Sequence, residues 1–373
     1  MKLKKFMKTT KIKNKGIDYP IFVGAGSINI LGKQLKLCCK SAKKIAIIFD
    51  KKVPVKYKNI IKKQLKNYKI YIHEYFVNEN LKSFERANNL AEKLIQNKFN
   101  RNDVLISVGG GVIGDFSGFV ASIVKRGIYH VNLPTTLLAQ VDASIGGKTG
   151  VNSKYGKNLI GSFYSPQLVI IELKFLESLN RRELVCGFAE ILKHSLIYDK
   201  KFFYWLKKNT RKIIDELNFE SLRFAITKSC KIKLHFVSGD IKEKNKRMVL
   251  NFGHTFAHAI EAASNFSRRI NHGEAVLIGM HLATKLSLKK KICSYSTMNE
   301  IQNFYKKNKL PLKLENYFSK RYVSKITQYM SNDKKNTDDK INFILLRNIG
   351  RTTKPGEFKL STNDIKKIFK KII

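Results

Sequence analysis

Three histidines lie within one short stretch of the sequence, residues 251–276, in a chain that has eight histidines. His254 and His258 are four residues apart, so in a helix they would lie on one face, and His272 follows in the segment NHGEAV. Clustered imidazoles are typical of a zinc site. A zinc protease would carry H-E-x-x-H, in which the glutamate is the general base. Because Thr255 follows His254 here, the pattern argues against peptide hydrolysis.

A carboxylate that would complete a metal site lies upstream, in the segment CGFAEILKHSL. Glu190 is followed about one helical turn later by Lys193 and His194, so the three would share a helix face. Two histidines and one carboxylate are a recurrent ligand set for a catalytic zinc ion, which keeps one coordination position open for substrate. A single histidine is more often a core or surface residue, but Glu190, His254 and His272 come from three separate elements and together predict a metal site.

A glycine-rich segment, SVGGGVIGDFSGF, follows an apolar run and begins a helical pattern. Gly109, Gly111 and Gly114 match G-x-G-x-x-G, and the strand-to-helix position strengthens this short motif. Glycines there let the backbone approach a pyrophosphate, and the amides of the helix start favour negative charge. Asp50 ends the run KIAIIFD, where a carboxylate can hold ribose hydroxyls. The alternatives are a tight turn without a ligand and a capping role for Asp50; the two features together favour a nucleotide site.

The segment between residues 135 and 163 combines many groups that suit a phosphate. Lysines supply charge, and glycines expose backbone donors. A flexible loop without a ligand is the alternative. The P-loop pattern G-x-x-x-x-G-K-[ST] is not matched, which disfavours ATP or GTP hydrolysis. The residues concerned are Thr135, Thr136, Asp142, Gly146, Gly147, Lys148, Gly156, Lys157 and Asn158.

Two sequence patterns predict the elements that position these residues. The first half alternates β-branched runs with amphipathic stretches, which predicts a parallel sheet covered by helices on both faces. After about residue 175 the apolar residues recur at three-to-four spacing. We therefore expect an α/β, Rossmann-like NAD-binding domain over residues 1–175 and a mainly α-helical metal- and substrate-binding domain over 176–373, with a cleft between them. The expected strands are 21–26, 44–50, 69–77, 103–111, 129–136, 167–173 and an isolated 340–350, and the expected helices include 89–99 and 115–126.

Composition indicates a globular, reduced protein. The 373 residues, of which 43% are hydrophobic, suffice for a substantial core, and no apolar run reaches the length of a membrane span. Five cysteines without a CxxC pattern favour free thiols, and with no apolar leader we expect a cytoplasmic protein. The net charge of +44 is spread as lysine along most segments, which favours a solvated basic surface over a nucleic-acid groove.

These motifs resemble those of the 3-dehydroquinate synthase family of sugar-phosphate cyclases, over nearly the whole chain. The segments that carry the resemblance are GGGVIGDFSGFVAS, RGIYHVNLPTTLLAQVDASIGGKTGVN, GKNLIGSF, GFAEILKH, NFGHTFAHAIE and HGEAVLIGM, in matching order and spacing. The resemblance implies bound NAD, a catalytic divalent metal (Zn or Co), a homodimer, and no specific nucleic-acid or membrane partner. It implies conversion of 3-deoxy-D-arabino-heptulosonate 7-phosphate to 3-dehydroquinate and phosphate, through transient oxidation by NAD, phosphate β-elimination, re-reduction, ring opening and aldol cyclisation.

The resemblance also implies residue roles, position by position. The metal ligands would be Glu190, His254 and His272. The segment VNENLKS stands where the family has an Asp-Gly-Glu type of turn. The implied NAD positions are Asp50, Glu79, Lys82, Gly111, Val112, Ile113, Gly114, Asp115, Thr135, Thr136, Lys148, Lys157, Phe175, Leu176, Glu177 and Ser178. The implied substrate and catalytic positions are Asp142, Lys148, Asn158, Lys193, Lys233, Arg247, Asn251, His258, one of Lys334 and Lys335, and Arg126, which would reach the neighbouring subunit's phosphate site.

Three rival functions fit parts of the sequence. One is another sugar-phosphate cyclase, acting on glucose 6-phosphate or sedoheptulose 7-phosphate, and another is a metal-dependent polyol dehydrogenase. The third, a nucleic-acid-binding protein, rests on the +44 charge alone. The lysine-rich segment argues against a simple dehydrogenase, and Lys233 with Arg247, which suit a carboxylate, favour the heptulosonate.

Overall fold

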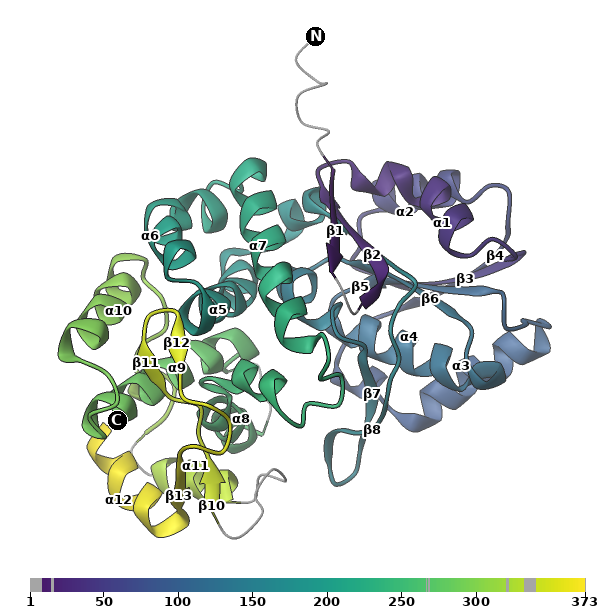
Figure 1. Cartoon of the computed structure of the whole chain (residues 1–373). Coiled ribbons are helices and arrows are strands. Elements are labelled where there is room, and N and C mark those ends of the chain that lie inside the picture. The colour runs from purple at the N-terminus through teal and green to yellow at the C-terminus, as the bar shows by residue number, and fades with distance from the viewer. Residues whose placement is uncertain are drawn as a thin grey trace. The chain divides into compact units, whose positions relative to one another are not determined.

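The computed structural model in Figure 1 describes residues 9–14, 17–265, 267, 269–319, 322–331 and 340–372. The chain forms two compact units. The first consists of the residues up to Asn180 together with Leu217–Lys242, and the second of Arg181–Glu216 and the residues from Glu243 onward. Each compact unit thus combines two separate ranges of the sequence, whereas the predicted domains, 1–175 and 176–373, meet at a single boundary. That domain boundary stays a prediction.

The first unit is built on a seven-stranded sheet with the order β1-β2-β9-β6-β5-β3-β4. All neighbouring strands are parallel except β1 and β2, which are antiparallel. This confirms the predicted parallel α/β fold. The strands are β1(Thr10–Asn14), β2(Ile17–Gly24), β3(Lys44–Asp50), β4(Lys69–Tyr75), β5(Val104–Gly109), β6(Tyr129–Pro134) and β9(Leu168–Glu172).

Helices cover both faces of this sheet, because the inner strands are apolar on both sides. In β3, Ile45, Ile47 and Phe49 contribute to one buried cluster, and the alternate Ala46 and Ile48 contribute to the other. Each fully buried isoleucine stabilises the fold by roughly 1.5–3 kcal/mol. As Figure 1 shows, α1 and α2 lie on one face and α3 and α4 on the other. The helices are α1(Leu31–Cys38), α2(Val55–Gln64), α3(Phe84–Gln96) and α4(Gly111–Ile123).

The strand order reverses at the carboxyl ends of β3 and β5. The chain passes from β3 to β4 on one side and then crosses to β5 on the other side of β3. In an open parallel sheet, ligands bind at such a switch point, outside the carboxyl ends of the strands. The parallel strands of the sheet lead at their carboxyl ends into the 3-10 helices η2(Ser27–Ile30), η3(Glu79–Leu81) and η6(Leu173–Ser178) and into the segment of the π-helix η5(Ala139–Ala143). The hairpin of β7(Lys148–Ser153) and β8(Gly156–Phe163) packs against α4, and the 3-10 helix η4(Val124–Arg126) connects α4 to β6. The unit is completed by α7(Phe219–Val237), which packs against β1, β2 and η5.

The second unit is mainly helical, as predicted. The helices α5 and α9 pack against each other, and α9 also packs against α8. No helix in the described part of the chain is both long and apolar enough to cross a membrane. The elements are α5(Arg181–Tyr198), α6(Lys200–Ile214), η7(Lys246–Asn251), α8(His254–Ala263), α9(His272–Lys289), α10(Tyr295–Lys307), η8(Leu314–Asn316), α11(Tyr322–Ser331), β10(Lys340–Asn342), β11(Leu346–Asn348), β12(Arg351–Thr352), β13(Lys359–Ser361) and α12(Thr362–Ile372).

The prediction of one strand over residues 340–350 was wrong. Two short strands, β10 and β11, lie there, and they pair with different partners, β13 and β12. The intervening residues 343–345 are buried but leave the ladder. An apolar run marks burial, and it does not by itself distinguish a strand from a buried connection.

Candidate active site

Glu190, His254 and His272 meet in the second unit, where three helices converge. Glu190 comes from α5, His254 begins α8, and His272 begins α9. The Nε2 atoms of His254 and His272 lie 3.5 Å and 3.8 Å from Oε1 of Glu190. One ligand atom from each of the three residues lies within 4.8 Å of the others. The predicted ligand set is thus brought together, with the spacing that a single bound cation would need.

The Glu190 carboxylate is fully buried, and its negative charge is neutralised by a neighbouring lysine. Lys193, one turn along α5 and itself buried, forms an ion pair with it. Both carboxylate oxygens are buried, and the contacts that the described residues make with them are the Lys193 ion pair and the approach of the two imidazoles. Burial raises the pKa of Glu190, but Lys193 and the two histidines outweigh it and hold the pKa well below its usual range. A buried, ionised and under-coordinated carboxylate beside two imidazoles fits a divalent Zn²⁺ or Co²⁺ ion.

The two histidines differ in their charge environment. Burial lowers the pKa of His254 well below its usual range, and the nearby Lys193 lowers it further. Burial also opposes protonation of His272, but Glu261 and Glu190 outweigh it and raise its pKa well above the usual range. Metal ligation requires the neutral imidazole of each histidine, so binding a cation would release a proton from His272.

Local sequence explains how the two histidines reach their positions. Gly253 precedes α8 with φ +80°, and a Cβ there would lie 2.7 Å from the backbone nitrogen of Met280 in α9. Glycine at this position therefore lets α8 and α9 approach closely. The start of α9 is fixed by a capping box, in which Asn271 accepts from the Glu274 backbone N–H and the Glu274 carboxylate accepts from the Asn271 N–H. His272 is the first residue of that capped helix.

The other residues predicted for the second unit lie in three different settings. Arg247 is buried in η7, and Asn251, at the end of η7, donates from Nδ2 to Glu243 Oε1 over 2.7 Å. His258 is exposed on α8, with its ring 5.3 Å from that of His254. Lys334 and Lys335 lie outside the described residues.

In the first unit, the glycine-rich turn joins β5 to α4 as the sequence predicts. The N-cap of α4 is Gly110, and a Cβ on Gly109 would lie 2.7 Å from the side chain of Ile113. A Cβ on Gly110 would lie 3.2 Å from Thr136, so a side chain here would occupy the space above the helix start. This glycine-lined N-terminus of a long helix, at the switch point of the sheet, fits the pyrophosphate of a dinucleotide.

A polar network connects this turn to the β7–β8 hairpin. The buried Lys82 donates from Nζ to Asp115 Oδ2 over 2.7 Å and also forms a short contact with the Asn158 carboxamide oxygen. Asp115 is partly buried, and this burial raises its pKa against the opposing effect of Lys82. The backbone carbonyl of Lys82 accepts from the N–H of Asn152 over 2.7 Å. Lys82, Asp115 and Asn158, predicted from distant segments, therefore lie together.

A second pair of predicted residues lies in the same region. Lys157 Nζ is 3.2 Å from Glu79 Oε2, and Asn152 Nδ2 donates to Glu79 Oε1 over 2.9 Å. Burial raises the pKa of Glu79, but the hydrogen bond from Asn152 and the charge of Lys157 together lower it below its usual value. Asn152 was missed in the sequence analysis, although it lies inside the segment of residues 135–163.

A further ion pair joins α7 to η5. Lys233 Nζ donates to the carbonyl oxygen of Asp142 over 2.7 Å and to its Oδ1 over 2.6 Å. Lys233 is buried, whereas Lys148 at the start of β7 is exposed. The two lysines predicted for substrate in this unit thus differ, because one is held by a carboxylate and the other reaches solvent.

Several predicted site residues also make contacts within the fold. Asp50 Oδ1 accepts from the Lys52 N–H over 2.9 Å, as in a turn, and Thr136 Oγ1 accepts from the Ala139 N–H over 3.2 Å. Phe175 is buried in the core of the first unit. Arg126 is exposed in a tight turn, with φ 61°. The remaining NAD positions lie in α4 (Gly111, Val112, Ile113, Gly114), after β6 (Thr135) and in η6 (Leu176, Glu177, Ser178).

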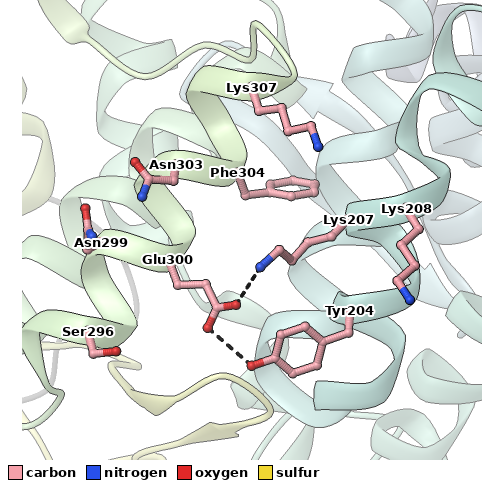
Figure 2. A pocket seen from close by; sticks show the side chains of 9 residues that line it. All are labelled: Tyr204, Lys207, Lys208, Ser296, Asn299, Glu300, Asn303, Phe304 and Lys307. Carbon is pink, nitrogen blue, oxygen red and sulfur yellow. Dashed lines mark hydrogen bonds and ion pairs between the residues drawn. The ribbon is translucent and has the colours of Figure 1, made fainter.

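The second unit also has a surface pocket. It has a volume of about 730 Å³ and is lined by residues of α6 and α10, including Lys207, Lys208 and Lys307 (Figure 2). Glu300 connects the two helices, because it accepts from Lys207 Nζ over 2.7 Å and from the Tyr204 hydroxyl over 3.3 Å. None of the predicted site residues lines this pocket.

Comparisons with known proteins bear on the identity of the whole chain. Residues 73–186 match the family model for the N-terminal part of 3-dehydroquinate synthase, and residues 187–336 match the model for its C-terminal part. The 3-dehydroquinate synthase of Pelagibacter ubique is 45% identical over 95% of this chain and 95% of its own. That of Dictyoglomus turgidum is 40% identical over 92% of each chain.

A solved structure is similar over the same extent. It is 2-deoxy-scyllo-inosose synthase complexed with carbaglucose-6-phosphate, NAD⁺ and Co²⁺. The similarity has a TM-score of 0.85 at 25% identity and covers 98% of this chain and 100% of that chain.

Proposed function

The chain belongs to the 3-dehydroquinate synthase family, and from this premise we propose how its residues divide the work of the reaction. The reaction converts 3-deoxy-D-arabino-heptulosonate 7-phosphate to 3-dehydroquinate and phosphate, with NAD and a divalent metal as cofactors. In chemical class the enzyme is a carbon–oxygen lyase acting on a phosphate ester. The observation that carries the assignment of roles is the convergence of His254 and His272 on the buried Glu190 carboxylate.

Glu190, His254 and His272 are the proposed metal ligands. Bound there, Zn²⁺ or Co²⁺ lowers the pKa of a coordinated hydroxyl. The buried Lys193 keeps Glu190 ionised before the metal arrives, so the carboxylate is ready as a ligand. The exposed His258 lies beside His254 and is proposed to exchange protons with the substrate.

The glycine-rich turn and its network are the proposed NAD site. Bound NAD supplies a hydride acceptor that is regenerated in each turnover. The amides at the start of α4 would hold the pyrophosphate, and Asp50, at the carboxyl end of β3, would hold ribose hydroxyls. Lys82 fixes Asp115 and Asn158 in place and thereby ties the turn to the β7–β8 hairpin.

Basic side chains are the proposed holders of the two anionic groups of the substrate. Lys148, Asn158 and, from the neighbouring subunit, Arg126 are assigned to the phosphate, and Lys233 and Arg247 to the carboxylate. Asp142 holds Lys233 through two contacts, so this lysine is oriented before substrate arrives. The role of Arg126 requires a homodimer, which is part of the proposal. The five free cysteines support a reducing location such as the cytoplasm.

Glu190→Gln tests this division of work. The substitution keeps the shape of the side chain but removes the charge that a divalent ion needs, so we expect loss of stoichiometric zinc and of turnover. NAD affinity, measured by fluorescence titration, serves as the control, because every proposed NAD residue lies in the other compact unit. A variant that retains both metal content and phosphate release would remove Glu190 from the site.

A further inference from the structure

Both candidate metal-binding histidines have an oxygen acceptor facing the ring nitrogen that points away from Glu190. His272 Nδ1 lies 3.2 Å from Oε2 of Glu261, and His254 Nδ1 lies 3.3 Å from the carbonyl oxygen of Phe252. In both rings Nε2 is the atom near the Glu190 carboxylate. Both imidazoles therefore direct Nε2 toward Glu190 and Nδ1 toward an oxygen acceptor.

This arrangement decides which nitrogen can bind a metal ion. A neutral imidazole carries its proton on one nitrogen and a lone pair on the other. An acceptor at Nδ1 keeps the proton there and leaves the lone pair on Nε2, and a carboxylate acceptor also makes the ring a stronger ligand.

We propose that Glu261 is a positioning residue that holds the His272 ring so that its Nε2 is the metal donor. Glu261 lies at Nδ1 of His272, the ring nitrogen that faces away from Glu190, so it acts through His272. The inference rests on the proposed metal site. Glu261 ends the segment NFGHTFAHAIE, but the sequence analysis gave it no role, because an acidic residue on a helix is usually solvated.

The local fold explains why Glu261 is in position. It lies seven residues after His254 in α8, so the two share a helix face two turns apart. His272 is fixed at the start of α9 by the capping box of Asn271 and Glu274. Glu274 is committed elsewhere, because its two oxygens accept from Arg182 over 2.7 Å each. Glu261 then provides the carboxylate at Nδ1 of the His272 ring, with 17% of its side chain exposed.

Zinc affinity of the full-length variants, measured by competition with a chelating dye, tests the proposal. Glu261→Gln keeps an oxygen acceptor without the charge, and Glu261→Ala removes the acceptor. Loss of such a partner weakens metal binding by roughly 10–100-fold. We therefore expect zinc affinity to fall from wild type to Glu261→Gln and further to Glu261→Ala, with the Ala variant near the roughly 100-fold end of this range. Glu92→Gln, an exposed glutamate of α3, is the matched control and should bind zinc as wild type does.

Two further readouts separate positioning from a merely structural role. The visible spectrum of the Co²⁺-loaded protein reports ligand geometry and should change in the Ala variant, while NAD affinity should stay at the wild-type value, because the proposed NAD residues lie in the other compact unit. Wild-type zinc affinity in both Glu261 variants would overturn the proposal and leave the proposed metal site intact. Failure of the wild type itself to bind zinc would instead overturn the proposed function, and the role of Glu261 with it.

Discussion

At the scale of single residues, the site is defined by charge that is buried and balanced. Residue types and spacing predicted Glu190, His254 and His272, because clustered metal-ligating side chains are uncommon in so short a stretch. They did not predict a role for Glu261, although it lies seven residues after His254 and ends the segment NFGHTFAHAIE. Nor did they predict that Lys193 would neutralise Glu190, because an i,i+3 pair reads equally well as an exposed helix face.

The buried pair gives a prediction about stability. Lys193→Met would leave the Glu190 carboxylate buried without its ammonium partner, and breaking such a pair costs about 3–5 kcal/mol. We expect the metal-free variant to unfold at lower urea concentration than wild type, and zinc to stabilise it more than it stabilises wild type. Lys207→Met, which breaks the exposed pair with Glu300, is the control and should change stability by less than about 1 kcal/mol. Equal stability of the metal-free Lys193→Met and wild-type proteins would show that the pair is not energetically coupled.

At the scale of elements, prediction succeeded where burial and periodicity agree. The strand β3 is buried on both faces, and it spans the predicted residues 44–50. The β7–β8 hairpin, in contrast, was not predicted. Every residue of β8 is half-buried or exposed, so little hydrophobic pattern marks this hairpin. In the segment 340–350 the hydrophobic pattern was strong but the predicted strand was wrong. Phe343 and Leu345 are buried outside any strand, and their backbone N–H groups donate hydrogen bonds to the Phe358 carbonyl and the Thr353 hydroxyl.

The contact of α8 with α9 gives the prediction at this scale. Gly253→Ala would place a Cβ 2.6 Å from the Met280 side chain and 2.7 Å from its backbone nitrogen, in a residue with φ +80°. Backbone strain and overpacking together should destabilise the protein by about 2–5 kcal/mol and weaken zinc binding, since His254 follows directly. Gly239→Ala is a matched control, because Gly239 has the same φ of +80° but no atom within 4 Å of the added Cβ. It should cost about 1–2 kcal/mol, the backbone strain alone. Equal losses in the two variants, measured by urea unfolding, would mean that helix contact at Gly253 contributes nothing.

At the scale of the whole molecule, composition excluded more than it specified. A net charge of +44 suits an enzyme whose substrate carries both a phosphate and a carboxylate, because a positive field attracts anions over long range. The same charge would suit a nucleic-acid-binding protein; the even spread of the lysines argues against that function, and the ordered set of motifs decides for the enzyme. Those motifs extend over both compact units, so the family could be recognised from the sequence. The extent of each unit could not be predicted, because each unit combines ranges that are separated in the sequence.

The measurement that tests the central claim most directly follows phosphate and NADH together. The purified chain, loaded with NAD and zinc, is given 3-deoxy-D-arabino-heptulosonate 7-phosphate, and then the assay is repeated after exhaustive chelation. We expect phosphate release that requires both NAD and metal, with no net accumulation of NADH, because the hydride returns to the substrate in each turnover. Accumulation of NADH without phosphate release, or release that survives chelation, would contradict the account.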